Sequence, residues 1–267
     1  MIDFQKITTS SRRYNFHAHT QFCDGRAPME DFIVKAIEEG FTDYGFSPHS
    51  PIPFESPCNM KQSDVAAYTA ETERLKALYG DRINIYRSME IDYIDANWGP
   101  SSPYFDSLGL DYRIGSVHFI PCGDIFVDTD GRYSSFQVKM EKYFDNDIRY
   151  VVDSFYRQTL AMIEAGGFDI IGHFDKIGSN ASYFQPGIEN EEWYAAHVKN
   201  VIEAIKDNHL IVEINTKSLA EHGRFFPNVR YFDAIRRYDI PVIVNSDAHV
   251  PALINAGRFE AFEAYFK

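Results

Sequence analysis

Cysteine, long apolar runs and blocks of positive charge are all scarce in this sequence of 267 residues. The three cysteines (Cys23, Cys58 and Cys122) are widely spaced and form no Cys-x-x-Cys pair, which argues against a cysteine-based zinc or iron–sulfur site. No stretch of about 18 apolar residues occurs, so we predict no transmembrane helix and expect no membrane partner. With a mixed polar start to the chain, these features favour a cytoplasmic enzyme with free thiols.

The charge balance also excludes some partners. The formal net charge is −13, and lysine and arginine form no cluster along the chain. Binding to a phosphate backbone depends on many cationic contacts, so a nucleic-acid partner is not expected and a small substrate is favoured. Hydrophobic residues make up 45% of the sequence, which is enough for one large core, and we predict a single domain over residues 1–267.

Apolar segments of strand length alternate with segments of helical spacing. The predicted strands cover residues 14–17, 42–47, 83–91, 112–118, 168–172, 210–214 and 241–245. The predicted helices cover residues 29–39, 63–79, 148–165, 191–208, 229–237 and 258–267. Alternation of this kind predicts an α/β fold with parallel strands joined by helical crossovers. One long insertion, residues 121–144, follows a strand, and we expect a lid or substrate-shaping loop there.

Six of the nine histidines lie at the carboxyl ends of predicted strands, and Glu90 and Asp247 are placed in the same way. The six are His17, His19, His49, His118, His173 and His249. Because the carboxyl ends of parallel strands meet at one edge, these side chains are expected to converge there. A His-x-His pair such as His17 and His19 is alone compatible with two solvent-exposed imidazoles. Repetition at the further strand ends favours a metal site instead.

Several short motifs resemble, in order, those of the polymerase and histidinol phosphatase (PHP) superfamily. They are His17-Ala18-His19-Thr20, Asp24-Gly25, Ser47-Pro48-His49-Ser50, Met89-Glu90-Ile91-Asp92, Gly115-Ser116-Val117-His118-Phe119, Gly172-His173-Phe174-Asp175 and Asn245-Ser246-Asp247-Ala248-His249. They span residues 17–249, and the middle of the chain is most similar to the histidinol-phosphate phosphatase branch. The resemblance implies a distorted seven-stranded parallel β/α barrel that holds three divalent metal ions.

The resemblance also implies a set of metal ligands. Carried over by position, they are His17, His19, Asp24, His49, Glu90, His118, His173, Asp247 and His249. Glu90 matches the bridging carboxylate, whereas Asp24 begins an Asp-Gly pair that is by itself a common turn. Nitrogen and oxygen ligands of this kind suit zinc, manganese or iron. Lys176, Lys217 and Arg224 follow strand ends and are candidates to bind phosphate, although each is also compatible with a solvated loop charge.

The implied activity is hydrolysis of a small phosphate monoester, most specifically L-histidinol phosphate in histidine biosynthesis. A metal-bridging hydroxide would attack phosphorus, and Asp247 or His249 would protonate the departing alcohol. Two alternatives remain on the same scaffold. One is a phosphodiesterase or nuclease, which the acidic balance disfavours, and the other is an inactive metal-binding interaction module. Three aromatic residues after the fourth predicted strand, Phe119, Phe126 and Tyr133, are predicted to wall a pocket for an imidazole ring.

Overall fold

The structure is a computed structural model that describes residues 2–266. Its strands form two parallel sheets and one antiparallel hairpin. The first sheet has the order β1 (Tyr14–Asn15), β2 (Asp43–Phe46) and β3 (Asn84–Arg87). The second has the order β10 (Val242–Asn245), β9 (Ile211–Asn215), β8 (Ile170–Ile171), β5 (Ile114–Ser116) and β4 (Glu90–Asp92). The predicted α/β class with parallel strands is therefore confirmed.

Two isolated parallel bridges join the sheets just beyond the ends of their strands. Ala18, which follows β1, pairs with Ala248, which follows β10. His49, which follows β2, pairs with Glu90 at the start of β4. These bridges bring the carboxyl ends of strands from both sheets to one edge of the molecule.

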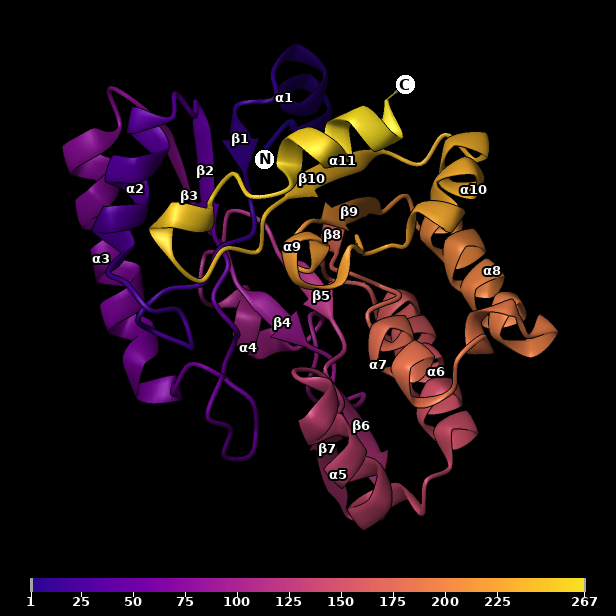
Figure 1. Cartoon of the computed structure of the whole chain (residues 1–267). Coiled ribbons are helices and arrows are strands. Elements are labelled where there is room, and N and C mark those ends of the chain that lie inside the picture. The colour runs from indigo at the N-terminus through magenta and orange to yellow at the C-terminus, as the bar shows by residue number, and fades with distance from the viewer. Residues whose placement is uncertain (1, 267) are drawn as a thin grey trace.

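Helices cover the outer faces of both sheets (Figure 1). Beside β1–β3 lie α2 (Met29–Glu38) and α3 (Val65–Tyr79), whose apolar sides include the buried Phe32, Tyr68 and Leu75. The second sheet is flanked by α6 (Ile148–Ala165), α7 (Ile177–Phe184), α8 (Glu192–Asp207) and α10 (Phe232–Arg237). Elsewhere in the described chain lie α1 (Phe4–Ser10), α4 (Pro103–Asp106), α9 (Leu219–His222) and α11 (Arg258–Tyr265). No helix within residues 2–266 is both long enough and apolar enough to cross a bilayer.

One predicted strand, residues 83–91, is in fact two strands. β3 ends at Arg87 and pairs with β2, whereas β4 begins at Glu90 and pairs with β5. The chain changes sheets at Ser88 and Met89, where the Ser88 amide still donates to Phe46 and the Met89 carbonyl already accepts from Ile114. Both halves are apolar and strand-like, so the sequence pattern has no mark at the crossing point.

The insertion at residues 121–144 is more regular than a loop. β6 (Phe119–Cys122) and β7 (Ile125–Asp128) form an antiparallel hairpin, and α5 (Tyr133–Phe144) follows it. The turn uses Gly123 at a φ of +57°, a conformation that glycine adopts without a Cβ clash. In α5 the buried residues Phe136, Met140 and Phe144 recur every four positions, a helical period that the sequence contained.

Candidate metal centre

His17 and His19 both point into the interior directly after β1, and both are fully buried. Their Nε2 atoms are 3.2 Å apart. Asp247, beyond the end of β10, places Oδ1 3.0 Å from His19 Nε2 and 3.9 Å from His17 Nε2. The three donor atoms therefore form one group, within 4.8 Å of one another, that could hold a metal ion.

Glu90 lies between imidazoles from four different strand ends. Its Oε2 is 3.3 Å from His17 Nε2 and 3.1 Å from His49 Nδ1. Its Oε1 is 2.7 Å from His173 Nε2 and 3.5 Å from His118 Nε2. His49, Glu90 and His118 make up a second donor group.

Asp24 supplies the carboxylate of a third group, with His19, His49 and His249. Its Oδ1 is 3.3 Å from His249 Nε2 and 3.6 Å from His19 Nδ1. The following residue, Gly25, packs so tightly that a Cβ there would lie 2.2 Å from the Thr20 amide nitrogen. Only glycine lets this turn fold back against the backbone, which is what aims Asp24 at the histidines.

Three buried polar atoms at the site have no hydrogen-bond partner: Asp24 Oδ1, His49 Nδ1 and His118 Nε2. An unpaired buried polar atom costs about 1–3 kcal/mol, so each of these requires a partner. All three belong to the donor groups and face other donors across gaps of 3.1–3.9 Å. Cations held in these donor groups would give each of the three atoms a partner, so the residues fit a metal centre.

The charges in the site depend on each other. Although burial alone would raise it, the pKa of the Glu90 carboxyl lies well below its usual range because His17, His118 and His49 surround it. Burial and the neighbouring imidazoles of His249 and His49 hold the pKa of His19 well below its ordinary value. Glu90 is thus a carboxylate and His19 a neutral imidazole, the protonation states that bind a divalent ion. In spite of burial, neighbouring carboxylates raise the pKa of His17 and His118, so these two rings would lose a proton when an ion binds.

Two carboxylates orient metal-site histidines by contacting the ring nitrogen that points away from the site. Asp92 Oδ1 is 2.7 Å from His118 Nδ1, and Glu213 Oε1 is 2.6 Å from His17 Nδ1. Fixing the outer nitrogen in this way leaves Nε2 of each ring free to face the site. Asp92 lies in the motif Met89-Glu90-Ile91-Asp92, whereas Glu213 lies outside every motif and was missed. Its signal is a charged residue inside the apolar strand β9, where it is fully buried.

Backbone strain is present at two of these residues. His173 has a φ of +23° and Asp247 a φ of +50°, backbone angles that residues other than glycine rarely adopt. Such strain concentrates where surrounding structure holds a functional side chain in place. At Asp247 the Asn215 amide nitrogen donates to Oδ2 over 3.1 Å and contributes to this restraint.

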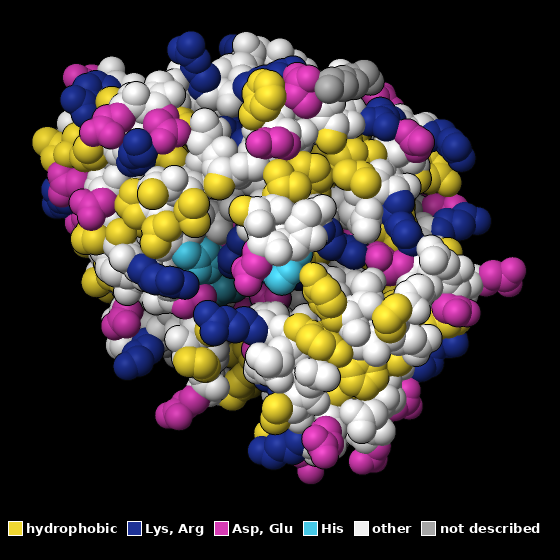
Figure 2. All heavy atoms as spheres, in the orientation of Figure 1, with side chains coloured by type: hydrophobic (Ala, Val, Ile, Leu, Met, Phe, Trp, Pro, Cys, Tyr) yellow, Lys and Arg dark blue, Asp and Glu magenta, His cyan; other side chains and the backbone are white. Residues whose placement is uncertain are grey.

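The three predicted phosphate-binding cations occupy different surroundings. Lys217 Nζ is 3.4 Å from Asp247 Oδ1 and 3.2 Å from His249 Nε2, so it borders the donor groups. Lys176 follows His173 closely, and its Nζ is 2.7 Å from Asp130 Oδ2. Figure 2 shows histidine atoms exposed near the centre of this face, with basic and acidic side chains around them.

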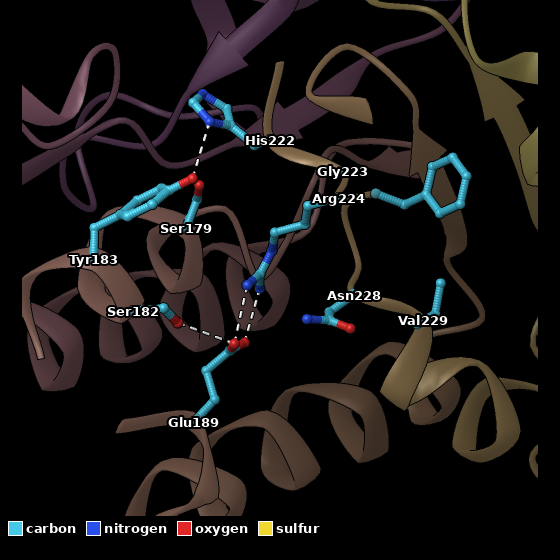
Figure 3. Close-up of a pocket in the computed structure, with 10 residues that line it drawn as sticks. Ser179, Ser182, Tyr183, Glu189, His222, Gly223, Arg224, Asn228 and Val229 are labelled. Atoms are coloured by element: carbon cyan, nitrogen blue, oxygen red, sulfur yellow. Dashed lines mark hydrogen bonds and ion pairs between the residues drawn. The ribbon is translucent and has the colours of Figure 1, made fainter. Parts of the chain in front are cut away.

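Arg224 is already engaged by carboxylates. Its guanidinium is 2.9 Å from Asp175 Oδ2. It also lies 2.8 Å from Glu189 Oε1 (Figure 3). It lines a separate cavity of about 270 Å³ between α7 and α9, which His222 and Tyr183 also border. Asp175, the last residue of the motif Gly172-His173-Phe174-Asp175, accepts a hydrogen bond from Arg224.

Fold and site together define an α/β protein with a polynuclear metal centre at the carboxyl edge of its strands. The PHP domain model matches residues 15–217, more than half of the chain, so this chain belongs to the PHP domain family. The resemblance found in the sequence motifs is therefore confirmed.

Individual relatives agree with this membership. A protein of Schizosaccharomyces pombe named "Probable histidinol-phosphatase" is 28% identical over 258 residues, which cover 88% of this chain and 80% of the relative. Among solved structures, a "putative histidinol phosphatase" from Listeria monocytogenes superimposes with a TM-score of 0.81 at 19% identity, covering 94% of this chain and 99% of the other. The histidinol phosphate phosphatase of Lactococcus lactis, solved with zinc, L-histidinol and phosphate, gives 0.69 at 20% identity, with 95% and 94% covered.

Proposed function

We propose that this chain is a metal-dependent phosphomonoesterase that hydrolyses L-histidinol phosphate to L-histidinol and phosphate. The observation that carries the proposal is the set of three donor groups, which share His19 and His49 and meet around Glu90. The relative from Schizosaccharomyces pombe and the solved structure from Lactococcus lactis supply the substrate class. The corresponding role is a step of histidine biosynthesis, for which we expect a cytoplasmic location.

We assign the nine residues carried over from the family motifs as metal ligands. Eight of them belong to the three donor groups, and His173 joins them through its contact with Glu90 Oε1. The donors are imidazole nitrogens and carboxylate oxygens, a set that suits zinc, manganese or iron. Because the Lactococcus lactis structure contains zinc, zinc is the first ion to test. Bound ions would polarise a water for attack on phosphorus and neutralise the phosphate oxygens.

The protein's own residues supply the remaining steps. Lys217 lies next to the donor groups, and Lys176 follows the proposed ligand His173 in the chain and pairs with Asp130. We propose that these two lysines bind the phosphate oxygens. Arg224 is neutralised by Asp175 and Glu189, so it enters this role only if those ion pairs open. Asp247 and His249 are the candidate donors of a proton to the departing alcohol, because both belong to donor groups and lie beside Lys217, where we propose that the phosphate binds.

We further infer that the two parallel sheets form one closed barrel within a single domain. The bridges Ala18–Ala248 and His49–Glu90 support a ring of seven strands in the order β1, β2, β4, β5, β8, β9 and β10. β3 then lies outside the ring as an extension of β2. In this arrangement residues 121–144 stand at the mouth as a structured lid rather than a loop.

The proposed function is tested by measuring phosphate release with and without added Zn²⁺ or Mn²⁺. The substrates are L-histidinol phosphate, glycerol phosphate and a dinucleotide. Metal-dependent turnover with a preference for L-histidinol phosphate is expected. Preference for the dinucleotide would favour a phosphodiesterase, and no turnover of any substrate in metal-loaded protein would favour an inactive interaction module.

Removing the metal ions is expected to destabilise the folded chain. A ligand at 100 times its dissociation constant stabilises a protein by about 2.7 kcal/mol, which for a chain of this size corresponds to roughly 5–10 °C in Tm. Calorimetry of chelator-treated protein with and without added Zn²⁺ measures the difference. An unchanged Tm, with no metal found by elemental analysis, would contradict the proposed centre.

Replacing Glu213 by glutamine is expected to weaken metal binding by about 10–100-fold without unfolding the chain. Glutamine keeps the shape, but its single oxygen can accept only one of the hydrogen bonds that Asn215 and Asn245 donate to the two carboxylate oxygens. It also removes the charge that holds the outer nitrogen of His17. Metal titration followed by phosphate release measures the effect. Glu38→Gln, at an exposed position on α2, is the matched control, and equal metal affinity in both variants would show that Glu213 does not support the site.

A further inference from the structure

Two segments of the chain, a loop and a β-hairpin, begin and end at the donor group of His49, Glu90 and His118. The first is the loop 50–60, whose closing residue Met60 donates its amide to the His49 carbonyl over 3.1 Å. Asn59 in the same loop donates to Asp92, the carboxylate that holds His118. The second is the β6–β7 hairpin, which begins directly after His118 and returns when the Thr129 amide donates to the His118 carbonyl over 2.9 Å.

Aromatic rings of the loop and of the hairpin pack against each other. The Phe54 ring from the loop and the Phe126 ring from the hairpin are parallel within 3°, with centroids 5.8 Å apart. The Phe119 ring meets Phe54 edge-on at 5.3 Å. Phe119 is the neighbour of His118 in the chain, so the three rings rise from the rim of the donor group. Phe119 is buried, but Phe54 and Phe126 are half-buried and retain exposed ring surface.

We propose that Phe54 and Phe126 form an aromatic clamp that binds the imidazole ring of the substrate. The inference rests on the proposed function, and it names the residues that select the organic half of the molecule. In L-histidinol phosphate a three-carbon chain separates the imidazole from the ester oxygen, so a phosphate held at the metal centre leaves the ring at the rim. A flat ring gains stacking and cation–π energy on phenylalanine that an alkyl chain of equal reach does not.

The clamp differs from the wall that the sequence suggested. Tyr133, expected beside Phe119 and Phe126, packs instead on Tyr183 of α7 with centroids 5.4 Å apart. Its place is taken by Phe54, which comes from a separate loop. Because each segment is fixed to a histidine of the same donor group, the clamp stands at a constant position relative to the metal centre.

The test compares Phe54→Leu and Phe126→Leu with wild-type enzyme loaded with Zn²⁺. Leucine keeps the apolar packing, and Phe259→Leu, at a residue of α11 that is 70% exposed, is the control. Two substrates are used: L-histidinol phosphate and 2-aminopropyl phosphate, which has the same amine and ester but no ring. Binding of the product L-histidinol is measured separately by calorimetry, so that affinity for the ring is read without turnover.

Each clamp variant is expected to raise KM for L-histidinol phosphate about three- to tenfold and to weaken L-histidinol binding by the same factor. Its KM for 2-aminopropyl phosphate should change less than twofold, and the control should match the wild type. Equal losses on both substrates, or no loss on either, would overturn the clamp while leaving the proposed function intact. Wild-type enzyme that hydrolyses 2-aminopropyl phosphate but neither hydrolyses L-histidinol phosphate nor binds L-histidinol would overturn both.

Discussion

Glu90→Gln is expected to lower kcat by about 10³-fold or more, a loss of roughly 4 kcal/mol of transition-state stabilisation. Glu90 contacts His17, His49, His118 and His173, and no other carboxylate among the described residues stands between so many of the site's imidazoles. Glutamine has the same shape but no charge, and its amide nitrogen cannot bind a cation. The loss should therefore appear both in phosphate release and in the metal content of the purified protein.

The control for this experiment is Glu38→Gln, which makes the same chemical change on exposed α2. Thermal unfolding of both variants separates loss of metal from loss of fold. Retention of full turnover and of bound metal by Glu90→Gln would mean that the donor groups do not form the catalytic centre. Loss of metal with turnover retained would mean that hydrolysis does not depend on the metal centre.

Asp247→Asn is the second large effect that we expect, with kcat on L-histidinol phosphate lowered by about 10³-fold or more. The Asp247 carboxylate lies 3.0 Å from His19 Nε2 and 3.4 Å from Lys217 Nζ, so it joins the donor group to a cation. In spite of its burial, Lys217, His17 and His19 hold the pKa of Asp247 well below the usual range, so it is charged at neutral pH. It could therefore give a proton to the alcohol only after taking one from the attacking water. Asparagine tolerates the positive φ at this position, so the backbone should be preserved.

The leaving group distinguishes the two roles proposed for Asp247. Hydrolysis of p-nitrophenyl phosphate needs little protonation of its leaving group, whereas an alcohol departs only with a proton. If Asp247 takes part in proton transfer, its variant should lose about 10-fold less activity on p-nitrophenyl phosphate than on L-histidinol phosphate. Losses of equal size on both substrates would restrict Asp247 to metal binding and leave His249 as the proton donor.

Much of the fold follows from short-range patterns. Helix α2 was expected at residues 29–39 and ends one residue earlier, because Gly40 adopts a φ of +76° and stops it. What the sequence could not reveal was set by distant contacts. The crossing at Ser88 and Met89 exists only because β2 and β5 lie on either side of it. The short helix α1 was missed for a similar reason, since its one buried residue, Phe4, packs on Phe16 and Tyr112.

The site residues were best predicted from the sequence where a ligand-type side chain lies at the end of a predicted strand. All six strand-end histidines lie together with Glu90 and Asp247, as the pattern indicated. The pattern was weaker for side chains whose partners come from elsewhere. Nothing near Arg224 in the chain marks Asp175 and Glu189 as its partners, and nothing near Phe54 marks Phe126. Glu213 was the exception, because a buried charge in an apolar strand could have been noticed.

The separation of the donors along the chain sets the order in which the protein matures. His17 and Asp247 belong to one donor group, yet they are among the first and the last residues of the site to leave the ribosome. A nascent chain without β10 therefore cannot assemble that group, and it must first bring its two ends together through contacts that are remote in sequence. The proposed ions would then be captured by a nearly complete fold, so the metals available in the cell at that moment would decide which ion is retained.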